Sequence, residues 1–274
     1  MKKDNNKVIY WLLTGCILIF IMVVVGGITR LTHSGLSISN YKLISGVIPP
    51  MNDIEWQEAF DLYKQYPEYQ KLNNHFNLQD FKDIYFWEWL HRVIGRFIGL
   101  VFLLPFIYFL ITKQLSKPTI TKSVILLGLG AFQGFMGWYM VKSGLVNDPH
   151  VSQYRLTAHL GLAIVIYGYM LWVALGLLYP KTNDSKQNPS LARLAVIIST
   201  MIFITALSGG FVAGTHAGFA FNTFPLMDGR LIPVGLFDQS PLWRNFFENI
   251  VTVQFNHRVL ATLLFVLIPI FWFK

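Results

Sequence analysis

Six long apolar stretches constrain the fold of this chain more than any other feature. The first, residues 8–28, has 21 uncharged residues, which is enough to cross a bilayer as a helix. Backbone polar groups in hydrocarbon must be satisfied internally, so a spanning segment is either a helix or part of a closed barrel. The alternation typical of barrel strands is absent. We therefore predict an all-α polytopic membrane protein with these spans: 8–28, 88–112, 122–141, 156–179, 192–213 and 250–273.

Composition agrees with this class and excludes others. The chain is 54% hydrophobic and only 13% charged. A net charge of +8 would suggest nucleic-acid binding in a soluble protein. In a membrane protein, an excess of Lys and Arg on one set of loops explains the charge. We therefore expect no nucleic-acid partner. No small-residue cleavage site follows the first span, which indicates a retained helix. Cys16 is the only cysteine, so one chain can form neither a disulfide nor a thiolate metal cage.

The distribution of charge predicts the orientation. Basic residues gather before the first span, between the second and third, and between the fourth and fifth. In contrast, the long loop 30–86 has five Lys or Arg against seven Asp or Glu, and the loop 214–249 has two against three. We therefore expect a cytoplasmic N-terminus and two long loops on the outer side. Residues 55–83, amphipathic and of mixed charge, are interpreted as a solvated lid.

The chain contains an internal repeat. Gly26-Gly27 with the following Thr-His-Ser-Gly recurs 183 residues later as Gly209-Gly210 with Thr-His-Ala-Gly, and Glu88–Val93 recurs 166 residues later as Gln254–Val259. The copies are four spans apart, so the halves keep one orientation. We predict tandem four-helix bundles, with domains at 1–185 and 186–274. The first bundle is complete and the second stops after two helices, so we expect an incomplete chain.

Three histidines lie inside predicted spans that enter the membrane from the same side. His91 and His159 are about four residues into their spans and His257 about eight, so all three fall at similar depth. Two imidazoles from neighbouring helices can hold a flat iron porphyrin, although imidazole also suits copper and zinc. The alternative for each is a hydrogen-bonded contact between helices. His33 and His216 flank the ends of spans and are interpreted as interfacial loop residues.

Glu88 shares a helix face with His91, and polar groups that enter a membrane mark a site by default. Its carboxylate could act as a base or charge stabiliser near a bound substrate, or it could form an ion pair with Arg92 at i,i+4. The second copy has the neutral Gln254, which suggests that only the first half does chemistry. Arg92 and Arg258 could pair with porphyrin propionates. From these residues alone, a bis-histidine b-type cytochrome carrying electrons between a quinone and a partner ranks first.

Longer motifs resemble a known family, heme A synthase, of the type without a cysteine pair in the first outer loop. The resemblance extends over nearly the whole chain in order. The matching stretches are 26–32, 34–37, 46–50, 88–92, 155–160, 221–229 and 254–258. The chain departs from the family pattern in two ways. The last two helices, which carry a fourth histidine, are absent, and residues 30–86 contain no cysteine.

This resemblance implies eight helices in two bundles, each with a heme site. It implies oxidation of the C8 methyl of heme O to a formyl group by successive hydroxylations, giving heme A for terminal oxidases. His91 and His159 would bracket the substrate heme with Glu88 as an essential acid, and His257 would ligate a heme b cofactor. A non-enzymatic factor for heme handling or oxidase assembly is a further alternative.

We also expect several properties of the protein as a whole. It would be a multi-pass protein of the cell inner membrane, with its heme sites toward the outer face, and a homo-oligomer. Its partners would include a quinone or membrane redox protein as electron acceptor, heme O synthase and oxidase assembly factors.

Overall fold

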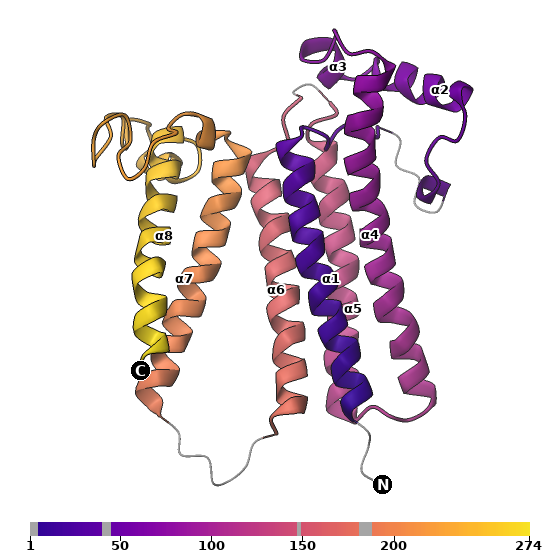
Figure 1. The fold of residues 1–274 in the computed structure, drawn as a ribbon, viewed down its shortest axis with the longest axis vertical. Helices are drawn as coiled ribbons and strands as arrows, with labels where there is room; N and C mark the ends of the chain where they lie inside the picture. Colours follow the sequence, from indigo (N-terminus) through magenta and orange to yellow (C-terminus); the bar gives the residue numbers. More distant parts are fainter. Residues whose placement is uncertain (1–4, 40–44, 147–148, 181–187) are drawn as a thin grey trace. The chain divides into compact units, whose positions relative to one another are not determined.

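The computed structural model describes residues 5–39, 45–146, 149–180 and 188–274. Six of its helices are long and apolar enough to cross a membrane, and the described residues form no strand (Figure 1). The prediction of an all-α polytopic membrane protein is therefore confirmed. The six helices are α1 (Asn5–Leu31), α4 (Leu78–Ile111), α5 (Lys117–Lys142), α6 (Gln153–Leu178), α7 (Pro189–Gly214) and α8 (Ile250–Trp272).

Side-chain caps explain where several of these helices begin. Asn77 accepts hydrogen bonds from the backbone N–H groups of Gln79 and Asp80, and the Asp80 side chain accepts one from the Asn77 N–H, which completes a capping box. This cap starts α4 at Leu78 rather than at the predicted residue 88. Glu88 consequently lies about three turns inside the helix rather than at its beginning. Other caps are Ser116, Asn188 and Asn249.

The early start of α4 has a packing reason. Two short helices, α2 (Asp53–Tyr63) and α3 (Pro67–Lys71), form a lid on its first turns. Phe60 and Tyr63 of the lid pack with Phe81 of α4 in one buried cluster. The lid therefore has a small hydrophobic core, which the interpretation as a solvated segment did not foresee.

The chain divides into two compact units. Unit 1 comprises Met1–Val151 and Leu162–Lys181, and unit 2 comprises Ser152–Gly161 and Thr182–Lys274. Helix α6 is thus shared: its first turns pack with unit 2 and the remainder with unit 1. The predicted domain boundary at residues 185 and 186 lies outside the described residues and stays a prediction.

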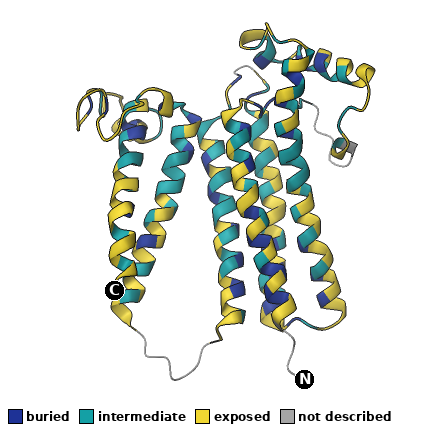
Figure 2. Ribbon diagram, in the orientation of Figure 1, coloured by how far each residue is buried: buried dark blue, intermediate teal, exposed yellow. Residues whose placement is uncertain are grey.

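In unit 1, four long helices contribute to a single hydrophobic core. Leu12 of α1, Phe106 of α4, Leu126 of α5 and Val173 of α6 are all buried in it. Dark blue segments mark buried residues along these helices (Figure 2). In unit 2, α7 and α8 pack against each other, and most of α8 is exposed or half-buried. The buried residues of α8 are concentrated in its first turns, next to the position of His257.

Candidate functional site

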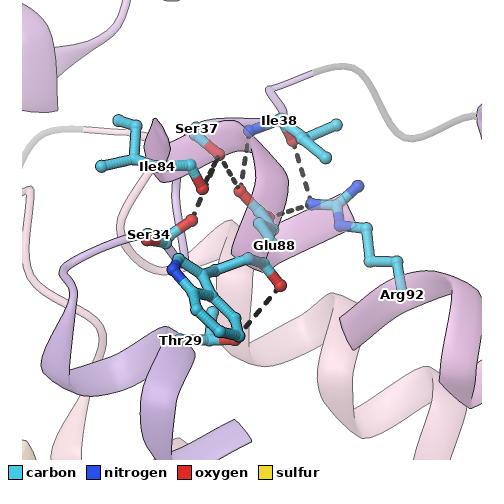
Figure 3. Close-up of polar contacts among 8 residues, drawn as sticks. Thr29, Ser34, Ser37, Ile38, Ile84, Glu88 and Arg92 are labelled. Carbon is cyan, nitrogen blue, oxygen red and sulfur yellow. Dashed lines mark hydrogen bonds and ion pairs between the residues drawn. The ribbon is translucent and has the colours of Figure 1, made fainter. Parts of the chain in front are cut away.

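Glu88 accepts three hydrogen bonds from two segments of the chain. Its side chain is buried where the loop after α1 returns to α4 (Figure 3). Oε2 accepts a hydrogen bond from the Ser37 hydroxyl at 2.7 Å and another from the Ile38 N–H at 2.8 Å. Oε1 accepts one from Arg92 at 2.5 Å. Glu88 therefore ties the loop to the helix through an ionic acceptor.

Arg92 is positioned by the same network. Besides its ion pair with Glu88, its Nη2 donates to the carbonyl oxygen of Ile38 at 3.0 Å. The ion pair at i,i+4, which the spacing allowed, is present. The pairing of Arg92 with a heme propionate stays a prediction.

His91 lies on α4 beside a glycine of α1. A Cβ on Gly26 would lie 3.2 Å from the His91 Nε2 atom and 3.5 Å from Cδ2. Any larger residue at position 26 would push the imidazole away, so glycine permits the close approach of the ring to α1. The repeated glycine and the repeated histidine are thus in direct contact in the first half.

The second half binds its own loop with different groups. Gln254 Nε2 donates to the carbonyl oxygen of Phe221 at 2.9 Å, and Arg258 Nη2 donates to the same oxygen at 2.7 Å. Arg258 also donates to the carbonyl of Thr223 through Nη1. Phe221 and Ile38 are 183 residues apart, which is the repeat spacing. The same loop position is therefore bonded to the same helix position in both halves.

The turns after α1 and α7 also match. The Thr32 and Thr215 N–H groups each bond to the carbonyl four residues earlier at 2.9 Å, and their hydroxyls bond to the same carbonyl at 2.8 Å. His33 and His216 follow with φ of 52° and 56°, in the left-handed region. Both histidines lie in turns, as the loop interpretation predicted, and the internal repeat is a structural repeat.

His257 has its imidazole oriented by a serine. The Ser208 hydroxyl donates to the Thr205 carbonyl at 2.7 Å, so Ser208 Oγ accepts the His257 Nδ1–H, 2.8 Å away. This leaves the Nε2 lone pair for a metal, the arrangement that protein ligands of iron use. Gly209 leaves room for the ring, because a Cβ there would lie 3.1 Å from His257 Cε1. The residues therefore fit axial ligation of a heme iron.

His159 lies in the part of α6 that belongs to unit 2, whereas His91 belongs to unit 1. The pairing of His91 and His159 around one iron therefore stays a prediction. Among the described residues, no group of three or more His, Cys, Asp or Glu side chains could hold a metal ion. A porphyrin would supply four iron ligands itself, so paired imidazoles suffice for it.

Two residues that position the site were not identified from the sequence. Ser37 donates to Glu88, and Ser208 accepts from His257. Ser37 belongs to a quoted motif, and Ser208 directly precedes the repeated glycine pair. A comparison of the two copies position by position would have drawn attention to both, because the second copy has alanine for Ser37 and the first has valine for Ser208.

Comparisons with known proteins agree with this picture. The family model COX15-CtaA, described as cytochrome oxidase assembly protein, matches residues 9–274. A heme A synthase of Nitrosospira multiformis is 53% identical over 272 residues, covering 98% of this chain and 76% of the relative. That of Flavobacterium johnsoniae is 52% identical, covering 100% and 81%, and that of Parvibaculum lavamentivorans is 48% identical, covering 98% and 78%. No solved structure matches.

Proposed function

The chain belongs to the COX15-CtaA family of cytochrome oxidase assembly proteins, and from this premise we propose that it converts heme O into heme A for terminal oxidases. The observation that supports this most strongly is the identity of about half of all positions, over almost the full chain, with proteins named heme A synthase. The oriented imidazole of His257 supports heme binding independently.

The proposed reaction oxidises the C8 methyl of heme O to a formyl group by successive hydroxylations. We propose that water supplies the oxygen atom, so that each hydroxylation breaks a C–H bond, forms a C–O bond and releases two protons and two electrons. The diol left by the second hydroxylation loses water to give the formyl group, and the released electrons require an acceptor. We propose a quinone or a membrane redox protein in this role. Heme b, when bound, supplies one-electron redox chemistry.

We propose that His91 and His159 are the axial ligands of the substrate heme and that His257 ligates heme b. Gly26 gives the His91 ring its place against α1, and Ser208 holds His257 in the tautomer that exposes Nε2. The Ser208 contact orients the His257 imidazole, whereas Gly26 only leaves room for the His91 ring.

Glu88 is the acidic group that we propose acts beside the substrate heme. Its hydrogen bonds to Ser37, Ile38 and Arg92 hold the carboxylate in one orientation. A fixed carboxylate can accept a proton or stabilise positive charge during methyl oxidation. Arg92 and Arg258, which now hold the two loops, are proposed to reach the propionates as well, because a guanidinium has several N–H donors.

The charge pattern supports an orientation with the N-terminus in the cytoplasm and both long loops on the outer side of the inner membrane. We propose heme O synthase as the upstream partner, oxidase assembly factors as downstream partners, and a homo-oligomer as the functional form.

Heme extraction tests the function. Membranes that contain this chain together with a source of heme O are extracted, and the hemes are separated by chromatography. The wild type is expected to produce heme A. Glu88→Ala is expected to lower its yield by about 100-fold or more, the range for losing a proton-transfer group. His91→Ala, which removes a proposed ligand of the substrate heme, is expected to abolish most of the yield as well.

His75→Ala is the matched control, because this histidine is exposed in the connection between α3 and α4 and is expected to leave the yield unchanged. If both site variants retain the wild-type yield, the site assignment is wrong. If the wild type binds heme but leaves heme O unaltered, the protein is an electron carrier instead.

A further inference from the structure

The first turns of α6 are held by unit 2 through a polar tether. Tyr154 donates from its hydroxyl to Glu248 Oε1 at 2.8 Å, and Arg244 donates through Nε to the other carboxylate oxygen at 2.8 Å. The Tyr154 ring also packs at 5.8 Å from Phe211 and at 6.1 Å from Phe247, measured between centroids. The start of α6 is thus joined both to α7 and to the segment that leads into α8.

Close backbone packing adds to this tether. A Cβ on Gly210 of α7 would lie 2.8 Å from Thr157 Oγ1 and 3.2 Å from Thr157 Cα, and one on Gly214 would lie 2.6 Å from Gln153 Cα. Glycines spaced by four residues on one helix face let two membrane helices approach closely. Since backbone atoms are among these neighbours, no rotamer change could make room for a larger side chain at Gly210.

The two adjacent glycines of α7 face two different helices. Gly209 lies against the imidazole of His257 on α8, whereas Gly210 lies against Thr157 of α6, two residues before His159. The adjacent residues Gly209 and Gly210 of α7 therefore lie against both helices that carry candidate heme ligands in unit 2.

We propose that the Gly209-Gly210 step, together with the Tyr154–Glu248 hydrogen bond, sets the position of His159 relative to His257. This inference rests on the proposed function, because it takes the two histidines as heme ligands. Gly210, Tyr154 and Glu248 are positioning residues, because they act through the placement of α6. A displacement of α6 then alters heme O binding at His159 and the environment of heme b at His257 together.

The first half contains the matched control. Gly27 is the counterpart of Gly210 in the repeat, but a Cβ at Gly27 would meet no atom within 4 Å. Gly27→Ala therefore makes the same chemical change in an equivalent helix without displacing a neighbour.

The test uses the full chain purified with its hemes in detergent. Gly210→Ala is expected to weaken heme O binding about tenfold relative to Gly27→Ala, the effect of about 1.4 kcal/mol. It is also expected to shift the reduction potential and the optical spectrum of the heme at His257, readouts that do not depend on turnover. The inference is overturned if either heme O binding or the heme b signals are the same in the two variants.

A milder variant decides the question if Gly210→Ala fails to fold. Tyr154→Phe removes the hydrogen bond to Glu248 and keeps the ring packing, so about threefold weaker heme O binding is expected from the loss of one hydrogen bond to a charged group at a half-exposed site. Unchanged binding would overturn the inference. Failure of the wild type to form heme A would instead contradict the proposed function, whatever these variants do.

Discussion

In both copies of the repeat a guanidinium donates to a loop carbonyl, but the side chain one turn earlier is a carboxylate that accepts in the first copy and an amide that donates in the second. Glu88 accepts from the Ser37 hydroxyl and the Ile38 N–H. At the corresponding positions the second copy has Gln254 and Ala220, and Gln254 donates to the loop carbonyl instead. The anionic acceptor and the hydroxyl donor are thus both absent from the second copy, which indicates that the polar pair in the first copy is a unit.

The two copies also differ in the side chain that lies at the position next to the repeated glycine pair, close to the histidine. Ser208 accepts the Nδ1–H of His257, whereas Val25 stands at the equivalent position of the first copy and has no side-chain acceptor to offer His91. A permanently bound cofactor benefits from a pre-oriented ligand. The comparison teaches that the two copies keep the histidine of the repeat but place different side chains beside it.

The largest predicted effect comes from making the first copy resemble the second. Glu88→Gln removes the anionic acceptor of the loop, so heme A yield is expected to fall about 100-fold, as for loss of a proton-transfer group. Heme extraction from membranes measures the yield. Glu58→Gln, at an exposed position of the lid, is the control and should retain full yield. A Glu88→Gln yield within twofold of the control would show that the two copies are chemically equivalent here.

A smaller effect is expected from removing the serine that distinguishes the second copy from the first. Ser208→Ala removes the acceptor of the His257 Nδ1–H, and the affinity for heme b should fall about tenfold, as for other groups that orient a metal ligand. Spectroscopic titration of the purified protein with heme measures this. Thr262→Ala serves as the control, because that hydroxyl donates to the Arg258 carbonyl, four residues earlier in the same helix. Equal affinities in the two variants would contradict the orienting role of Ser208.

Ser37→Ala, which introduces the residue of the second copy, removes one of three donors to Glu88. The loss of one hydrogen bond costs about 1 kcal/mol, so heme A formation should slow by about fivefold. Initial rates in membranes with excess heme O provide the measurement. The Ser39 hydroxyl is buried without a hydrogen-bond partner among the described residues, so Ser39→Ala should not slow the reaction. Equal rates for both variants would make the Ser37 hydroxyl dispensable.

The smallest effect concerns the lid of the first copy, which has a buried acid. Glu68 accepts a hydrogen bond from the Tyr63 hydroxyl at 3.0 Å. The Tyr63 hydroxyl oxygen in turn accepts one from the side-chain amide of Asn73. Burial, with a lesser contribution from the nearby Glu88 charge, raises the pKa of Glu68 from 4.5 to about 7. A carboxyl group whose pKa is raised on folding stabilises the packed state fully below about pH 4.5, and this stabilisation is lost as the pH rises through about 7.

Hydrogen exchange of the α2 and α3 amides, corrected for intrinsic rates, should therefore be faster at pH 8 than at pH 6. Glu68→Gln should abolish the difference, and Glu58→Gln should retain it. If Glu68→Gln leaves the pH dependence intact, another group controls the lid.

Local patterns predicted much of the fold. The six spans, the repeat and the Glu88–Arg92 pair follow from apolar run length and helical spacing. The early start of α4 was missed, because the apolar run begins after the helix does. The Asn77 cap and the burial of Phe81 under the lid extend the helix into a polar stretch.

Contacts between distant segments could not be predicted in this way. Ser37 and Glu88 are 51 residues apart, and Ser208 and His257 are 49 apart. Helical periodicity says which side chains share a face of one helix. It does not say which loop atom comes to rest against that face, because this depends on how the chain reverses.

By itself, the sequence determined that this is a membrane protein of six long helices with a repeated histidine frame, since bilayer thickness and backbone hydrogen bonding leave an apolar chain few alternatives. Only the tertiary structure decided that Glu88 and Arg92 bind a loop, that Ser208 orients His257, and that the first turns of α6 belong with unit 2. Those outcomes depend on close packing at particular glycines and on side-chain geometry between helices, which no pattern along a single helix specifies.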